Sequence, residues 1–506
     1  MYEEYKKLID EACQRIYSVA KRTDLDLAPQ LSERHQNNIW LKREDQQPVF
    51  SYKLRGAYNM IASLSETERE CGVITASAGN HAQGVAMAAQ EMNINAIIVM
   101  PKTTPEIKVS SVKRMNAEVI LHGNTYDEAK DFAHVKSEKT GMCYVPPFDH
   151  PLVIAGQATV AVELMDQHPV KPEIIFVPVG GGGLISGIAA YLKDSYPDIK
   201  IIGVEHDEAP SMYAAFEADE RVILDQIGIF ADGAAVIQVG EENYRIAKES
   251  VDEVLLVNID EICASVKDIF EDTRSIPEPA GALALAGLKQ YIAREKICNK
   301  ELIAIFSGAN VNFDRLRHIA ELSALGENRE GLLVIGIPER PGSFRHLCHD
   351  LGPRLITEFN YRYGDNDDAF VFVGVQLKKG VAEKDALIKQ LIEKGYDVTD
   401  LSNDTIAKMH IRYMVGGHAP QAENEVIYRF EFPERSGALL HFLTEMGERW
   451  NISLFHYRNH GAAYGRVLIG FQVKEEDREQ FQKFVDGLGI TYWKETDNPA
   501  YQKFLS

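Results

Sequence analysis

Short apolar runs alternate with longer helix-like stretches between about residues 35 and 325, and this alternation constrains the fold more than any other feature. The apolar runs are residues 73–76, 96–100, 174–179, 201–205, 254–257 and 302–307. Apolar residues follow one another in these runs instead of alternating with polar ones, as in strands that are buried on both faces. Helical stretches between such strands indicate βαβ units, and therefore an α/β fold of parallel sheet with helices on both faces. In such folds, ligands bind beyond the carboxyl ends of the strands.

A different pattern, an internal repeat, begins after residue 325. Three blocks return at a spacing of 95 or 96 residues: 337–342 as 432–437, 358–362 as 454–458, and 371–377 as 467–473. Each copy is predicted to form a strand, a helix, two strands and a further amphipathic helix, which is typical of a small ferredoxin-like α+β domain. We therefore predict three domains, at residues 1–325, 326–415 and 420–506. The duplicated tail favours a regulatory role, and a duplicated oligomerisation domain without a ligand is the alternative.

Charge and targeting signals narrow the class of protein. Acidic side chains number 75 against 54 basic ones, and the resulting formal charge of −21 opposes binding to nucleic acid or to an anionic membrane surface. The sequence contains no run of 18 apolar residues, so no membrane span is predicted. No apolar signal core follows the amino terminus. The six cysteines are scattered, as is usual for reduced thiols. We expect a cytoplasmic protein without nucleic-acid or membrane partners.

Lys53 is the first candidate for a reactive side chain. Apolar residues recur at helical spacing after it, and Ser51 is a candidate N-cap, so Lys53 is predicted in the first turn of a helix. There the helix dipole and nearby Arg55 would disfavour the ammonium form. A lysine attacks a carbonyl only as the neutral amine, so this position suits a Schiff-base lysine. By itself the signal is weak, because most lysines in a first turn are simply solvated.

A loop of small and polar residues follows the run 73–76. It consists of Ser77, Ala78, Gly79, Asn80, His81, Ala82, Gln83 and Gly84. Small residues let a ligand approach the backbone, and the following helix offers free N–H groups to an anion such as a substrate carboxylate. Asn80 can donate to a phenolate oxygen. A tight strand-to-helix turn without a ligand is the structural alternative.

Four consecutive glycines close the run 174–179. They are Gly180, Gly181, Gly182 and Gly183, followed by Leu184. Successive amides of such a loop can converge on a phosphate, with the dipole of the next helix behind them. No Gly-Lys-Ser/Thr sequence follows, and Gly187 comes too late for the dinucleotide pattern, so a lone monophosphate is predicted.

Ser307 begins a fourth motif, at the end of the run 302–307. A hydroxyl at a strand end can meet a heteroaromatic nitrogen, although serine is also common in turns there. A lysine, two anion-binding loops and this serine are all expected at strand-to-helix junctions of one parallel sheet. The combination is far more specific than any one motif.

Taken together, these motifs resemble those of fold-type II pyridoxal-phosphate enzymes and, among them, of threonine dehydratases. The resemblance rests on Ser-Tyr-Lys-Leu-Arg-Gly at 51–56, Ser-Ala-Gly-Asn-His-Ala-Gln-Gly at 77–84, the tetraglycine, and Ser-Gly-Ala-Asn at 307–310. It runs from about Ile39 to Asn312, and the two repeats look like the ACT-like regulatory domains of the biosynthetic enzymes. It implies pyridoxal 5'-phosphate as cofactor. It also implies conversion of L-threonine to 2-oxobutanoate and ammonia, and of L-serine to pyruvate, as the first step of isoleucine biosynthesis.

The same resemblance implies a role for each motif. Lys53 would form the Schiff base, Asn80 would bond the 3'-oxygen of the cofactor, and Ser307 would meet the pyridine nitrogen. The phosphate would be held by Gly180, Gly181, Gly182, Gly183 and Leu184. The substrate carboxylate would be received by Ser77, Ala78, Gly79, Asn80 and His81. Tyr52 stands where the family often has phenylalanine, which leaves the lysine assignment intact.

For the repeats, the resemblance implies isoleucine as inhibitor, valine as activator, and a homotetramer. Residues 338–342 and 433–437, with neighbouring strands, are the candidates for effector contacts.

Three alternatives remain at this level. A degradative serine/threonine dehydratase or a serine racemase would share the motifs, but those chains lack the two repeats. An amino-acid sensor with an inactive catalytic body would keep the tail without the chemistry. A racemase often carries a divalent-cation site downstream of the glycine loop, for which Glu205, Ala209 and Asp232 are suggestive positions. They can equally cap strands or bind a monovalent ion, so we expect no metal.

Overall fold

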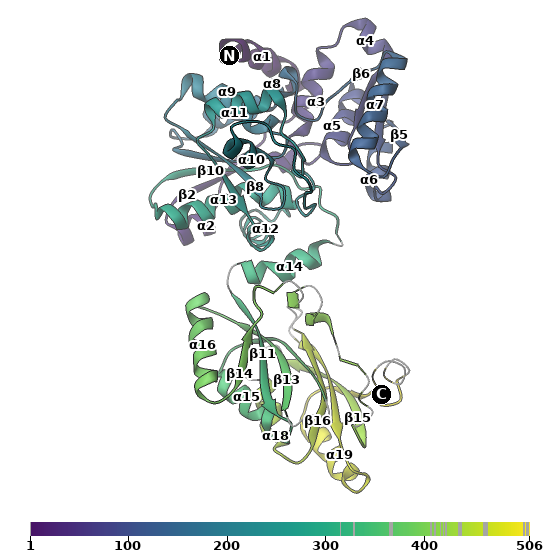
Figure 1. The fold of residues 1–506 in the computed structure, drawn as a ribbon, viewed down its shortest axis with the longest axis vertical. Helices are drawn as coiled ribbons and strands as arrows, with labels where there is room; N and C mark the ends of the chain where they lie inside the picture. The colour runs from purple at the N-terminus through teal and green to yellow at the C-terminus, as the bar shows by residue number, and fades with distance from the viewer. Residues whose placement is uncertain are drawn as a thin grey trace. The chain divides into compact units, whose positions relative to one another are not determined.

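The computed structural model describes residues 2–313, 315–326, 329–363, 368–404, 407–408, 411–414, 416–417, 419, 422–433, 438–458, 464–498, 501 and 505. They form two compact units, Met1–Ser323 and Ala324–Ser506, which are considered separately below (Figure 1). Within the described residues, no helix combines the length and the apolar character needed to cross a lipid bilayer.

The larger sheet of the first unit has six strands in the order β1-β2-β10-β7-β8-β9. They are β1 (Leu25–Leu27), β2 (Asn38–Arg43), β7 (Ile174–Pro178), β8 (Lys200–His206), β9 (Glu253–Val257) and β10 (Glu301–Phe306). Strand β1 is antiparallel to β2, and all other neighbours are parallel. The four predicted runs of this sheet are confirmed as strands. Strand β2 was not predicted, because Lys42 interrupts its run of apolar residues, although the structure buries this lysine as well.

A smaller, fully parallel sheet has the order β5-β4-β3-β6. Its strands are β3 (Val73–Ala76), β4 (Ala96–Met100), β5 (Glu118–Leu121) and β6 (Cys143–Tyr144). The expectation that one sheet carries all four motifs is therefore wrong. The loop 77–84 follows β3 of this sheet, whereas the glycines and Ser307 follow β7 and β10 of the larger sheet. Lys53 follows no strand directly, because the 3-10 turn η2 (Glu44–Gln46) separates it from β2.

Helices cover both faces of the larger sheet, which confirms the predicted α/β class. Ile175 and Val177 of β7 pack in one apolar cluster with α8 and α9, while Phe176 between them meets Tyr291 of α13 edge to face. The helical elements of this unit are α1 (Tyr2–Arg15), η1 (Ile16–Ser18), α2 (Pro29–His35), α3 (Lys53–Ala62), α4 (Glu66–Cys71), α5 (Asn80–Glu91), α6 (Glu106–Lys113), α7 (Tyr126–Thr140), α8 (Pro151–Gln167), α9 (Gly183–Ser195), α10 (Ser211–Ala218), α11 (Glu241–Ser250), α12 (Ile259–Thr273), α13 (Pro279–Glu295) and, crossing into the second unit, α14 (Arg315–Gly326).

Local sequence sets several of these helix boundaries. Three helices begin with a capping box, in which the N-cap side chain and a glutamate three residues later each satisfy a free backbone N–H. The pairs are Ser65 with Glu68 in α4, Thr125 with Glu128 in α7, and Asn258 with Glu261 in α12.

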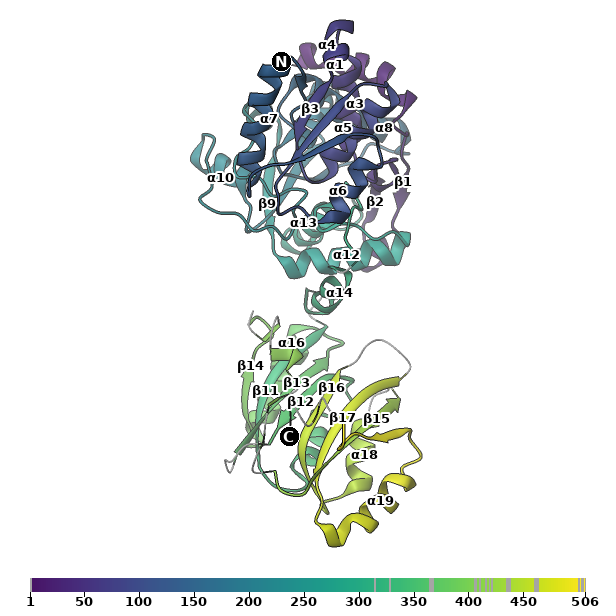
Figure 2. The same cartoon turned by 90° about the vertical axis from the view of Figure 1, so that its right-hand side faces the viewer.

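The second unit is built on one eight-stranded sheet in the order β14-β11-β13-β12-β16-β17-β15-β18, and Figure 2 shows its central strands side by side. All neighbouring strands are antiparallel. The first copy contributes β11 (Glu330–Pro338), α15 (Ser343–Leu351), β12 (Ile356–Arg362), β13 (Asp368–Gln376), α16 (Val381–Glu393) and β14 (Asp397–Asp400). The second contributes β15 (Glu425–Pro433), α18 (Ala438–Met446), β16 (Asn451–Arg458), β17 (Tyr464–Gln472), α19 (Arg478–Gly487) and β18 (Tyr492–Lys494). The 3-10 turns η3 (Ile411–Tyr413) and η4 (Glu475–Asp477) complete this part.

The two copies meet edge to edge through β12 and β16. Asn360 lies opposite His456, its counterpart in the repeat, and the register is symmetric about this pair. The predicted element order is confirmed in both copies, and each adds a short edge strand, β14 or β18, that the sequence did not reveal. The boundary at residues 415–420 stays a prediction, because residues 415, 418 and 420 lie outside the described set.

Candidate active site

All four predicted motifs line one cleft of about 1720 Å³ in the first unit, beyond the carboxyl ends of β3, β7 and β10. The cleft includes every residue predicted for the site: Lys53, Ser77, Ala78, Gly79, Asn80, His81, Gly180, Gly181, Gly182, Gly183, Leu184 and Ser307. Residues predicted from separate motifs, far apart in the sequence, are thus brought together.

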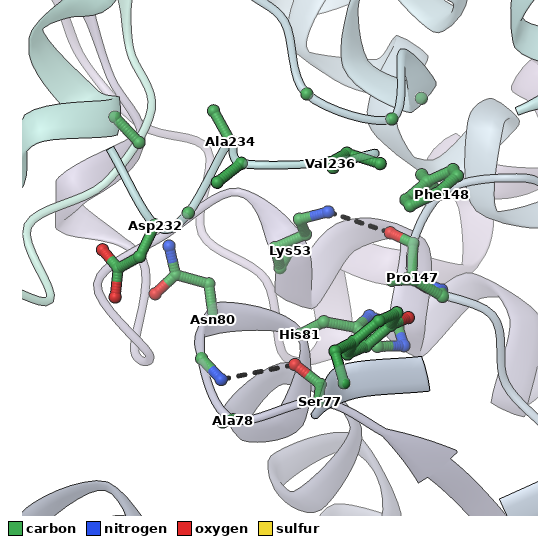
Figure 3. Close-up of a pocket in the computed structure, with 18 of the residues that line it drawn as sticks. Lys53, Ser77, Ala78, Asn80, His81, Pro147, Phe148, Asp232, Ala234 and Val236 are labelled. Carbon is green, nitrogen blue, oxygen red and sulfur yellow. Dashed lines mark hydrogen bonds between the residues drawn. The ribbon is translucent and has the colours of Figure 1, made fainter. Parts of the chain in front are cut away.

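Lys53 is the first residue of α3. Its Nζ donates to the carbonyl oxygen of Pro147 at 2.9 Å, as Figure 3 shows. Burial lowers the pKa of the Lys53 amine to about 8, against an opposing effect of the nearby Glu278 carboxylate. Much of this amine is therefore neutral under mildly alkaline conditions, as a nucleophile requires. The predicted N-cap is wrong: Tyr52 occupies that position, and no side chain caps the helix.

Arg55 does not act on Lys53 as predicted. Its side chain is fully buried and donates to Glu44 at 2.7 Å and to Glu163 at 2.6 Å. Lys42 Nζ joins this cluster at 2.6 Å from Glu163. Two cations thus face two carboxylates, and the cluster carries no net charge. Burial lowers the pKa of Lys53 instead, because the positive charge of Arg55 is neutralised by Glu44 and Glu163.

The loop 77–81 leads from β3 into α5, which begins at Asn80. The Ser77 hydroxyl accepts from the Gly79 N–H at 3.3 Å (Figure 3). The His81 imidazole is turned to the Val145 carbonyl oxygen, 3.0 Å from Nε2. Burial, and then the charge of Lys53, lower the pKa of His81 to about 3, so the ring is neutral and Nε2 donates. The free N–H groups at the start of α5 remain for an anion.

The glycine loop leaves no room for side chains. A Cβ on Gly181 would lie 2.2 Å from the Phe148 ring, and one on Gly180 would lie 2.9 Å from the Ala234 backbone. Gly182 has φ +93°, a conformation that favours glycine. The loop ends at Gly183, where α9 begins, and so presents free amides backed by a helix dipole. Leu184 follows as a buried residue of α9.

Ser307 is buried directly after β10. Its hydroxyl has one long contact, 3.4 Å to the Ala280 carbonyl oxygen. A hydroxyl held this loosely can still bond a ligand atom in the cleft.

Glu278 is a site residue that the sequence analysis missed. It lies in the cleft before α13, and Asn80 Nδ2 donates to its Oε1 at 2.5 Å. Burial, with the charge of Asp232, raises the pKa of the Glu278 carboxyl to about 7. The sequence contains only a weak indication of this residue. An acidic residue before a proline is common where a helix begins, so Glu278 before Pro279 did not indicate a functional site.

The residues considered for a cation have other partners. Glu205 accepts from the backbone N–H groups of Met212 and Tyr213, each at 2.8 Å, and so caps α10. Asp232 pairs with Lys108 at 2.7 Å and with Arg315 at 3.3 Å. In the described part of the chain, no three His, Cys, Asp or Glu side chains gather as metal ligands.

Comparison with family models agrees with this geometry. The model for pyridoxal-phosphate dependent enzymes matches residues 16–308, and the model for the C-terminal regulatory domain of threonine dehydratase matches residues 321–411 and 416–505. The second model thus matches the repeat twice.

The relatives match nearly the whole chain, and the solved structures match about three fifths of it. The biosynthetic L-threonine dehydratase of Pasteurella multocida is 51% identical over 492 residues, 97% of this chain and 96% of the relative. The mitochondrial threonine dehydratase of Saccharomyces cerevisiae is 48% identical over 504 residues, 97% of this chain and 87% of the relative. Processed threonine deaminase isoform 2 of Solanum lycopersicum superposes with a TM-score of 0.62 at 46% identity, over 64% of this chain and 89% of that one.

Serine racemase is one of the alternatives that would share the motifs. The serine racemase of Dictyostelium discoideum superposes with a TM-score of 0.56 at 32% identity. The match covers 98% of that chain but only 61% of this one, so more than a third of this chain has no counterpart there. Because the relatives match nearly the full length of the chain and the regulatory-domain model matches it twice, the chain belongs to the family of biosynthetic threonine dehydratases, which are pyridoxal-phosphate dependent enzymes.

Proposed function

We propose that this protein converts L-threonine to 2-oxobutanoate and ammonia, and L-serine to pyruvate, as the first step of isoleucine biosynthesis. One observation carries the proposal: a buried lysine with a depressed pKa shares a cleft with a glycine loop shaped for a phosphate. The family membership of the whole chain narrows the chemistry to dehydration of a hydroxy-amino acid.

The cleft fits pyridoxal 5'-phosphate. The loop 180–183 suits the phosphate, because its glycines carry no side chains that would occupy the space beside the backbone amides. The Leu184 amide follows at the start of α9. Lys53 suits the aldehyde, Asn80 the 3'-oxygen, and the loosely bonded Ser307 hydroxyl the ring nitrogen. When bound, the cofactor supplies an electron sink for the bond that breaks at Cα.

The chain's own residues bind the substrate and move protons. We assign the substrate carboxylate to the amides of residues 77–81, where the start of α5 offers free N–H groups. The neutral Lys53 amine takes the Cα proton, because its low pKa lets it alternate between the two protonation states near neutral pH. Ser307 has no charge to offer the ring nitrogen, and this favours prompt loss of the β-hydroxyl over a long-lived carbanion.

Regulation belongs to the second unit in this proposal, with isoleucine as inhibitor and valine as activator. Residues 338–342 are the candidate effector loop of the first copy. Its Glu339 accepts from Tyr361 of the same copy and, at 3.3 Å, from Asn451 of the second copy. A ligand bound here would therefore act on both copies. Residues 434–437 of the matching loop lie outside the described part.

We further propose a homotetramer in the cytoplasm. All six cysteines lie in the described part of the chain and are free thiols, which suits a reducing compartment.

The proposal is tested by measuring 2-oxo acid release from threonine and from serine, each with and without isoleucine. We expect release from both substrates and inhibition by isoleucine. Lys53→Ala should abolish turnover and the visible absorbance of the bound cofactor together, and retention of both would refute the lysine assignment. Serine racemisation without 2-oxo acid would favour the racemase alternative, and wild-type protein without cofactor absorbance would favour an amino-acid sensor.

A further inference from the structure

Asn310, the last residue of the Ser307 motif, uses both N–H groups of its side-chain amide inside the cleft. One donates to the backbone carbonyl oxygen of Val49 at 2.8 Å, and the other donates to Asn80 Oδ1 at 2.8 Å. A backbone carbonyl can only accept, so the nitrogen of Asn310 is assigned without ambiguity. Asn80 must then present its oxygen to Asn310.

The far side of Asn80 agrees with this assignment. Its Nδ2 faces Glu278 Oε1 at 2.5 Å, where a reversed amide would place two oxygens against each other. The Val49 carbonyl oxygen, which can only accept, therefore fixes the series through Asn310 and Asn80, and Glu278 accepts at its far end as the carboxylate. Asn80 is left with one N–H that neither neighbour uses.

We propose that Asn310 and Glu278 are positioning residues that hold the Asn80 amide with its spare N–H directed at the 3'-oxygen of the cofactor. This inference rests on the proposed function, which assigns that oxygen to Asn80. In the reversed amide, the Asn80 oxygen would face both the Glu278 carboxylate and the anionic 3'-oxygen. The locked amide replaces two repulsive contacts with two hydrogen bonds.

Tight backbone packing fixes Glu278 itself. Its backbone N–H donates to the Gly308 carbonyl oxygen at 3.1 Å. A Cβ on Gly308 would lie 2.6 Å from Glu278 Oε1, and one on Gly281 would lie 2.2 Å from the Gly308 oxygen. The segment 307–310 thus sets both neighbours of Asn80, in addition to supplying Ser307.

Asn310→Asp tests the inference, because it keeps the shape of the side chain and removes the donors. The new carboxylate would draw the Asn80 N–H groups toward itself and away from the cofactor. We expect the dissociation constant of pyridoxal phosphate from the apoprotein to rise about tenfold, equivalent to about 1.4 kcal/mol. We also expect the absorbance of the bound cofactor to shift toward the near ultraviolet, because the 3'-oxygen loses its donor and becomes protonated.

Asn312→Asp is the matched control, since it adds the same charge to another residue of the same cleft, whereas the Asn80 amide bonds Asn310 and Glu278. It should change neither affinity nor absorbance. Glu278→Leu should reproduce the loss, and Glu278→Gln should restore most of it, because its amide oxygen can still accept from Asn80. Should Asn310→Asp fail to fold, Asn310→Ser, too short to reach Asn80, is measured with the same expectation.

Wild-type affinity and absorbance in the Asn310 variant would overturn the positioning role and leave the proposed function standing. A wild-type protein that binds no pyridoxal phosphate would instead overturn the proposed function itself.

Discussion

Burial lowers the pKa of the Lys53 amine to about 8, and this is the property for which we propose Lys53 as the nucleophile. Arg55 was expected to disfavour the ammonium form, but its charge is matched by Glu44 and Glu163. Desolvation does this work, and it outweighs the opposing charge of Glu278. Burial of this amine thus accounts for the lowered pKa of the proposed nucleophile.

The rate at which pyridoxal phosphate attaches to the apoprotein should rise with pH through a midpoint of about 8. The neutral amine is the reactive form, so lowering the pKa from 10.5 raises the neutral share at pH 7 from roughly one in three thousand to about one in ten. Stopped-flow absorbance across this midpoint measures the rate. A midpoint near that of an ordinary lysine would contradict the argument.

Gly181→Ala should weaken cofactor affinity at least about tenfold, since the added methyl would overlap the Phe148 ring and distort the phosphate loop. Equilibrium titration of the apoprotein with pyridoxal phosphate measures the loss. Removing the ring should make room for the methyl, so Gly181→Ala combined with Phe148→Ala should bind better than Gly181→Ala alone. No recovery would mean that the loop fails for another reason.

At the scale of elements, α3 is held in place by the buried cluster of Arg55, Lys42, Glu44 and Glu163. The cluster joins α3 to η2, β2 and α8, and its four side chains are inaccessible to solvent. Buried ions are costly unless each has a partner, so the balance of two cations and two anions is what makes this anchor stable. The start of α3, and with it Lys53, is thereby fixed.

Glu163→Gln should destabilise the first unit by about 3–5 kcal/mol, because it leaves a buried positive charge without its counterion. Asp166→Asn is the matched control on the same helix: its partner is Arg22, and the two side chains are 56% and 50% exposed. It should change stability by less than about 1 kcal/mol. Thermal unfolding followed by circular dichroism compares the two, and equal shifts would argue against the anchor.

At the scale of the whole molecule, the second unit is a symmetric pair made within one chain. The copies join through β12 and β16 about the pair Asn360 and His456. A single copy would leave a full edge strand unpaired, and such edges promote aggregation. The outer edges are the short strands β14 and β18 instead.

A chain ending at Ser323, where the first compact unit ends, should still convert threonine but lose inhibition by isoleucine. The reason is that inhibition requires a ligand to bind two states unequally, and the ligand contacts are assigned to the second unit. Initial rates with and without isoleucine provide the measurement. Undiminished inhibition in a folded truncated enzyme would contradict the regulatory assignment.

Much of the lining of the candidate site was predictable, because these residues lie in short contiguous motifs. The glycines 180–183 and the loop 77–81 carry their chemistry in local backbone geometry, which sequence reports directly. Strands such as β3 and β4 were equally visible, since continuous burial leaves an unbroken apolar run. Strand β6 has two half-buried residues and left no such trace.

The amino-acid sequence alone determined the α/β class and the duplicated tail, and it pointed to Lys53 as the candidate nucleophile, because periodicity, repetition and short motifs are properties of consecutive residues. Only the tertiary structure decided that two sheets share the motifs, that Arg55 is neutralised, and that Glu278 and Asn310 bracket Asn80. Those outcomes depend on burial and on contacts between residues more than one hundred positions apart, which no local pattern encodes.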